Sequence, residues 1–161
     1  KQKTAYEIKE CDWSSDVCSS DLGTETLSAS SGYTGATIIS SGANLTLSGS
    51  GAIASSSGVA ANGTFDISGV TTSASIVTLS GSGTVTLGGK LLTITNGSTT
   101  FSGAIGGTGG QLTISGGTET LSASSGYTGA TIISSGANLT LSGSGAIASS
   151  SGVAANGTFD I

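Results

Sequence analysis

The stretch that decides the fold of this chain runs from Gly23 to Ile67 and reads GTETLSASSGYTGATIISSGANLTLSGSGAIASSSGVAANGTFDI. It returns without a change from Gly117 to Ile161, at an offset of 117 − 23 = 94 residues. Internal repetition on this scale is typical of architectures in which one supersecondary unit stacks on the next. Perfect identity indicates either a recent duplication or an error in which the assembly of short sequencing reads merged repeated segments.

A finer rhythm lies inside the 94-residue period. Short triplets alternate apolar and polar residues, so the two apolar side chains of each triplet share one face of a strand. Several triplets are about 20 residues apart, and strands this short bury enough surface only when they stack. Gly-rich joints such as SGSG, GGTGG and NG are expected to supply positive-φ corners between them. The triplets are LTL at 45–47, FDI at 65–67, VTL at 85–87, LTI at 92–94 and LTI at 112–114.

These patterns predict an all-β protein whose residues 23–161 form a parallel β-solenoid with roughly 20 residues per coil. Heavy Gly and Ser content disfavours long helices, and the low charge with 35% hydrophobic residues disfavours simple disorder. The alternative is a tandem β-sandwich of about 94 residues per domain. Few bulky side chains are available to fill two facing sheets, because the tract has no Trp or Cys and its aromatic residues are Tyr33, Phe65, Phe101, Tyr127 and Phe159.

Residues 106–143, GGTGGQLTISGGTETLSASSGYTGATIISSGANLTLSG, resemble the autotransporter passenger-associated repeat of Gram-negative bacteria. In that family a Gly-rich lead and an LT strand precede a Tyr-Thr-Gly turn, here 127–129, and a second strand follows, here LTL at 139–141. The resemblance implies a right-handed parallel β-helix that is exported and displayed or released at the cell surface. The family's secretion signal and C-terminal membrane barrel are not in this sequence, so we expect that the fragment could not export itself.

Residues 1–22 differ from the rest of the chain. They hold Trp13, Cys11, Cys18 and 8 of the 13 charged residues. The run DWSSDVCSSDL at 12–22 resembles the translation of an indexed sequencing adapter, and KQKTAYEI at 1–8 resembles the flow-cell end of the same oligonucleotide. The residues between them span a barcode-sized gap in frame. We therefore predict that residues 1–22 are a non-native segment without a stable fold, to be excluded from functional reasoning. Read as native residues, the two cysteines have no standard metal-ligand spacing.

The sequence predicts no enzyme, no cofactor and no metal site. Ser and Thr abound, but the chain has no His to act as a base. Lys90 is expected on the surface. The acids Glu25 and Glu119, like Asp66 and Asp160, are copies one period apart, four or five coils in a solenoid, which is too far for a glycosidase pair. GGTGG at 106–110 lacks the Asp of a calcium-binding turn.

Two further patterns resemble sites but have simpler explanations. Gly49–Ala54 fits a G-x-G-x-x-A dinucleotide fingerprint with Asp66 placed for a ribose, yet residues 55–62 are too short and too rich in Ser and Gly for the helix that such a loop must open. Five Asn-x-Ser/Thr sequences are read as Asn at turns, with the two Asn-Gly pairs at 62–63 and 156–157 as positive-φ corners or hairpin turns. The five are Asn44, Asn62, Asn96, Asn138 and Asn156.

Together these features predict a structural or adhesive stalk within a bacterial autotransporter-type protein. The expected location is the bacterial cell surface or the extracellular space. Expected partners are host-surface or cell–cell adhesion partners, neighbouring solenoid coils and a membrane barrel. Nucleic acid has no basic patch to bind, and no apolar run is long enough for a membrane helix. The alternative is a carbohydrate- or receptor-binding module of sandwich type, which would need clustered exposed aromatic side chains, here little beyond Tyr33 and Tyr127.

Overall fold

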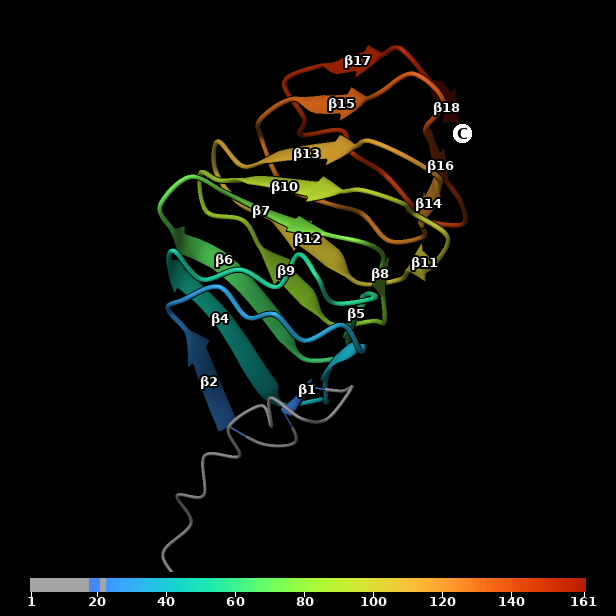
Figure 1. Cartoon of the computed structure of the whole chain (residues 1–161). Helices are drawn as coiled ribbons and strands as arrows, with labels where there is room; N and C mark the ends of the chain where they lie inside the picture. Colours follow the sequence, from blue (N-terminus) through green and yellow to red (C-terminus); the bar gives the residue numbers. More distant parts are fainter. Residues whose placement is uncertain (1–17, 21–22) are drawn as a thin grey trace, which may run out of the picture.

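The computed structural model describes residues 18–20 and 23–161, which form an all-β solenoid of about seven coils (Figure 1). Every strand pair in this part of the chain is parallel, and none of its residues is helical. The parallel pairing confirms the β-solenoid prediction and contradicts the sandwich alternative, whose strands pair antiparallel.

The strands lie on three faces, and each coil visits the faces in the same order. The first face stacks β1 (Cys18–Ser20), β3 (Thr37–Ile39), β5 (Val59–Ala61) and β8 (Leu79–Ser80), and continues through the Gly81–Phe101 bridge into β11 (Thr100–Phe101), β14 (Thr118–Leu121), β16 (Asn138–Leu141) and β18 (Thr158–Asp160). The second stacks β2 (Gly23–Leu27), β4 (Ala43–Gly49), β6 (Thr64–Val70), β9 (Thr84–Thr86) and β12 (Ala104–Gly106). The third stacks β7 (Ser73–Ile76), β10 (Leu91–Ile94), β13 (Gln111–Ile114), β15 (Thr131–Ile133) and β17 (Val153–Ala155).

Strand register sets the length of a coil. On the second face Leu45, Phe65, Val85 and Ile105 stand above one another, 20 residues apart at each step. The apolar members of the five triplets are buried, and their central polar residues point outward, as the alternation predicts. Individual coils vary around this length, since Val59 lies 22 residues after its partner Thr37.

The two identical segments occupy different faces. In the first copy β3 lies on the first face and β4 on the second, whereas their counterparts β15 and β16 lie on the third face and the first. The 94-residue offset therefore corresponds to four full coils and two of the three faces of a fifth, or 94 ÷ 4⅔ ≈ 20 residues per coil. Successive copies are rotated by one face about the solenoid axis. Because the faces number three, 3 × 94 = 282 residues would return a copy to its starting face.

The core is a set of aliphatic columns running along the axis. The largest fully buried side chains include Tyr127, Phe65 and Phe101, and the others are Ile and Leu. Full burial of one such side chain stabilises the fold by about 1.5–3 kcal/mol. Aliphatic and occasional aromatic side chains fill the narrow interior, which is why the chain folds with so few aromatic residues.

The corners follow the sequence only in part. Gly49, Gly81 and Gly109 take positive φ within SGSG and GGTGG joints, as expected. The Asn-Gly prediction is wrong, since no described residue other than Gly has positive φ, and the glycines of the Asn-Gly pairs do not have it either. Gly63 is needed for close approach instead, because a Cβ there would collide with the carbonyl oxygen of Ala43 in the coil beneath.

Three residues of the N-terminal segment are described. Cys18–Ser20 form β1 and pair in parallel with β3, Cys18 opposite Thr37. Backbone hydrogen bonding to an open strand edge accepts many sequences, so this pairing does not bear on the origin of the segment. Trp13 and Cys11 lie outside the described residues.

Candidate functional site

The residue with the most unusual environment is Glu119, in the middle of β14. Its neighbours Thr118 and Thr120 point outward, while Glu119 and Leu121 point into the core. Glu119 is fully buried and stacks beneath Leu139 of the next coil. An unpaired carboxylate is costly in such a place, because burial penalises the charged form.

The carboxyl group has a small polar neighbourhood. The hydroxyl Oγ1 of Thr99 lies 3.4 Å from Oε2 and donates to the carbonyl oxygen of Leu79 at 2.6 Å. The other carboxyl oxygen, Oε1, is buried and has no hydrogen-bond partner. Room for the side chain comes from Gly97, where a Cβ would lie 2.9 Å from the Cβ of Glu119 and 3.0 Å from Oε2.

This environment changes the protonation of the group. Burial raises the pKa of Glu119 from 4.5 to about 8, although the Thr99 hydrogen bond and a backbone hydrogen bond with Leu79 act in the opposite direction. The side chain is therefore mainly a neutral carboxylic acid at pH 7. A raised carboxyl pKa is common at catalytic sites, but a general acid must also reach a substrate, and Glu119 has no exposed surface.

The structure keeps the two copies of each acid apart. Glu25 is half-buried in β2 on the second face, whereas Glu119 is in β14 on the first. Asp66 and Asp160 are likewise separated, in β6 and β18. Asp66 accepts a hydrogen bond from the backbone N–H of Ser68 at 2.8 Å. The two copies of each acid therefore do not form a carboxyl pair for glycoside hydrolysis.

A second polar feature occurs once in each copy. The Tyr33 hydroxyl lies 2.7 Å from Oγ1 of Thr37, which lies 2.9 Å from Oγ of Ser56 in the next coil. Ser56 donates to the carbonyl oxygen of Gly35 at 2.8 Å. Because Ser56 donates to a carbonyl oxygen, Thr37 donates to Ser56 and Tyr33 donates to Thr37, and the sequence has no His to act as a base. This chain of hydroxyls ties neighbouring coils together.

The second copy repeats this chain with Tyr127, Thr131 and Ser150, at 2.7 and 3.0 Å. Burial raises the pKa of both tyrosine hydroxyls above the ordinary value, while the bonded threonines act in the opposite direction. Both rings are buried, so neither is an exposed aromatic platform for a sugar ring. The carbohydrate-binding alternative loses the two aromatic residues on which it depended.

The remaining candidates occupy corners and strand surfaces. Residues 55–58 form a corner rather than a helix, so the Gly49–Ala54 fingerprint has no helix N-terminus for a phosphate. Nζ of Lys90 lies 3.4 Å from the carbonyl oxygen of Thr71. Asn44 and Asn138 lie within β4 and β16, which corrects the prediction that all five asparagines sit at turns.

Sequence reasoning missed that Glu119 is buried, although a signal was present. In TETL (118–121) the glutamate and the leucine are two residues apart, so their side chains lie on the same face of the strand. The two glutamates differ in burial because of their place in the stack. Glu119 has described coils on both sides, whereas Glu25 lies in the first strand of its face.

Within residues 18–20 and 23–161, no group of three or more His, Cys, Asp or Glu side chains is placed to hold a metal ion. Across the same residues there is no helix long and apolar enough to span a membrane. Comparison of the chain with family models, curated proteins and solved structures finds no match.

Proposed function

We propose that this chain is a structural and adhesive stalk, a β-solenoid spacer within an autotransporter-type protein at the bacterial cell surface or in the extracellular space. The observation that carries the proposal is the continuity of the stack, in which three parallel faces run through the described coils around one aliphatic core. The resemblance of residues 106–143 to the passenger-associated repeat supports the cellular setting.

A stalk needs length and stiffness more than chemistry. Each added 94-residue unit contributes 4⅔ coils, or about 22 Å at ~4.8 Å per coil. Because successive units are rotated by one face, the same outward residues lie on a different side of the stalk in each of three successive units. Such a surface suits adhesion, in which many weak contacts with a host surface or another cell add up.

Length scaling tests the structural part of this proposal. Chains carrying one, two and three 94-residue units should gain about 22 Å of maximum dimension per unit in small-angle X-ray scattering. An increment that shrinks with each unit, or a compact particle, would contradict a stalk.

Display on cells tests the adhesive part. The chain would be placed between a secretion signal and an outer-membrane barrel, and adhesion of the cells to host cells and to one another would be measured. A control passenger of equal length with an unrelated sequence corrects for spacing alone. Adhesion no greater than that of the control would leave a spacer and remove the adhesive role.

A further inference from the structure

The outward side of the first face carries two columns of small polar side chains. Side chains alternate along a strand, so each coil adds one residue to each column. Strand register places the members of a column directly above one another, one per coil. We name these residues the hydroxyl array, which is Ser98, Thr118, Asn138 and Thr158 in one column and Thr100, Thr120, Thr140 and Asp160 in the other.

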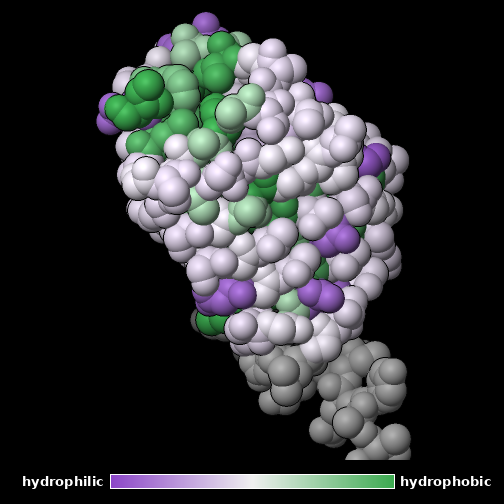
Figure 2. Space-filling model, turned by 180° about the vertical axis from the view of Figure 1, so that it is seen from behind, coloured by the Kyte–Doolittle hydropathy of each residue, from purple (hydrophilic) through white to green (hydrophobic). Residues whose placement is uncertain are grey.

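The hydroxyl array is open to solvent and almost uncharged. Each of its members is exposed or half-buried, and Asp160 is the one charged residue among them. Thr100, Thr120 and Thr140 have no hydrogen-bond partner in the described part of the chain. The surface drawn in Figure 2 is likewise made mainly of residues of intermediate hydropathy, with strongly hydrophilic residues at scattered points. The hydroxyl groups of these three threonines are therefore free to bind water.

The array is also regular and stiff. Neighbouring strands lie about 4.8 Å apart, and residues two positions apart along a strand lie about 6.6 Å apart. Backbone hydrogen bonds join the coils, as where the N–H of Thr120 donates to the carbonyl oxygen of Thr99 at 3.0 Å. A Thr side chain is stiff at χ1 because it is branched at Cβ. The hydroxyl and methyl groups therefore repeat in two perpendicular directions with little freedom to move.

We propose that the hydroxyl array is an ice-binding surface. On the prism faces of hexagonal ice the oxygen atoms repeat in two perpendicular directions at spacings of similar size, so water held over the array can continue into the crystal lattice. Each contact through an ordered water is weak, but the contacts form together on a rigid array and their free energies add. The proposal goes beyond the stalk function and does not depend on it.

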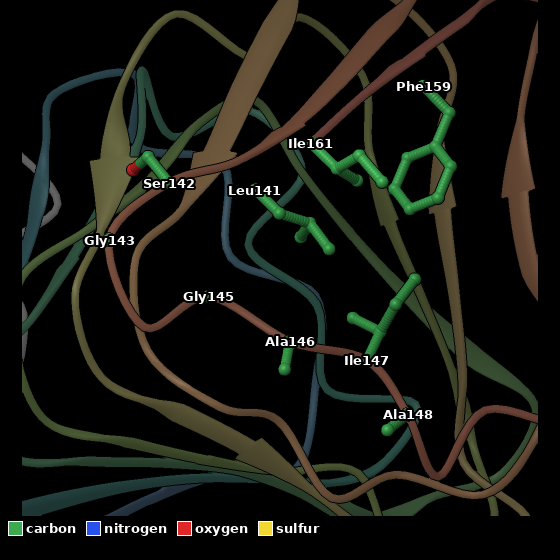
Figure 3. Close-up of a pocket in the computed structure, with 9 residues that line it drawn as sticks. All are labelled: Leu141, Ser142, Gly143, Gly145, Ala146, Ile147, Ala148, Phe159 and Ile161. Atoms are coloured by element: carbon green, nitrogen blue, oxygen red, sulfur yellow. The ribbon is translucent and has the colours of Figure 1, made fainter.

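The other surfaces of the described coils fit this ligand less well. On the second face Ala104 and Gly106 occupy array positions without a hydroxyl group, and on the third Leu91 and Ile132 point outward. The hollow at the last described coil is lined mainly by apolar residues (Figure 3). A polysaccharide is the other ligand for a polar face, but the aromatic rings of residues 23–161 all pack in or against the core and none is placed to stack on a sugar.

Uptake of the whole chain into ice tests the proposal. Ice would be grown slowly from a dilute solution of the protein, and the protein in the ice would be compared with that left in the liquid. We expect enrichment in the ice, from which ordinary solutes are excluded. Thr120→Tyr and, separately, Thr100→Tyr should each lower uptake at least fivefold, because the larger side chain prevents close approach of the crystal. The control Thr93→Tyr changes a half-buried outward Thr of β10 on the third face, and its uptake should stay within twofold of the wild type.

Three outcomes would overturn the proposal. The first is exclusion of the wild-type chain from ice. The second is uptake that is unchanged in both array variants, or lowered equally in Thr93→Tyr, while circular dichroism shows an intact solenoid. The third is binding of the wild-type chain to microcrystalline cellulose or chitin without uptake into ice, which would make a polysaccharide the ligand of this face.

Discussion

Replacing Glu119 by Gln should flatten the pH dependence of this protein's stability. The pKa of Glu119 is about 8 in the folded state and 4.5 when the group is freely solvated. Unfolding therefore releases a proton between these values, and the free energy of unfolding falls as the pH rises from about 4.5 to about 8, then levels off. The stabilisation that the protonated Glu119 side chain gives the folded state is fully present below pH 4.5 and lost above pH 8.

The size of this loss in the free energy of unfolding follows from the two pKa values. A pKa difference of 8 − 4.5 = 3.5 corresponds to a loss of about 5 kcal/mol across the window, at about 1.4 kcal/mol per pH unit. A Gln side chain keeps the shape of the carboxyl group and can donate to Oγ1 of Thr99 without ionising. Glu119→Gln should match the wild type within about 1 kcal/mol at pH 4.5 and exceed it by several kcal/mol at pH 9.

Urea unfolding followed by circular dichroism at pH 4.5, 7 and 9 measures this difference. The control is Asp160→Asn, which likewise replaces a carboxyl group by an amide, at an exposed side chain in the last strand of the first face. Its stability profile should stay close to that of the wild type. Parallel profiles for the wild type and Glu119→Gln would refute the idea that the folded protein holds this proton to pH 8.

Three further predictions concern single positions. Gly97→Ala should lower stability by about 1–3 kcal/mol, because the new Cβ would lie 2.8 Å from a backbone nitrogen of the next coil; Gly126→Ala, with no atom within 4 Å, should stay within about 0.5 kcal/mol in the same urea assay. Tyr127→Phe should cost about 1 kcal/mol in thermal unfolding by removing a 2.7 Å hydroxyl bond, and no loss would show that the hydroxyl chain adds nothing. Asn156 should deamidate faster than Asn62, as measured by peptide mass spectrometry at pH 8, because hydrogen bonds from Gly83 and Thr84 hold the backbone on both sides of Asn62 and no described coil lies over Asn156; equal rates would contradict this explanation.

Much of the fold could be read from local patterns. Triplets such as LTL at 45–47 and FDI at 65–67 predict short strands with two inward apolar side chains, and the structure confirms each of them. Their spacing of about 20 residues predicts the coil length, since stacked strands must recur once per coil. Corners were less predictable, because Gly63 serves close approach between coils and not a positive φ. That requirement depends on Ala43 in the coil beneath, which the local sequence does not reveal.

At the candidate site, too, the sequence determines some features and the stacking of coils determines others. Glu119 and Leu121 are two residues apart in TETL, so backbone geometry alone places them on the same face of the strand. Whether that face meets core or solvent depends on the coils above and below, so identical residues at Glu25 and Glu119 have different burial. The one-face rotation between copies is also a tertiary property, because it depends on the summed lengths of several coils. Sequence by itself determined which side chains turn inward, and stacking decided which of them are covered.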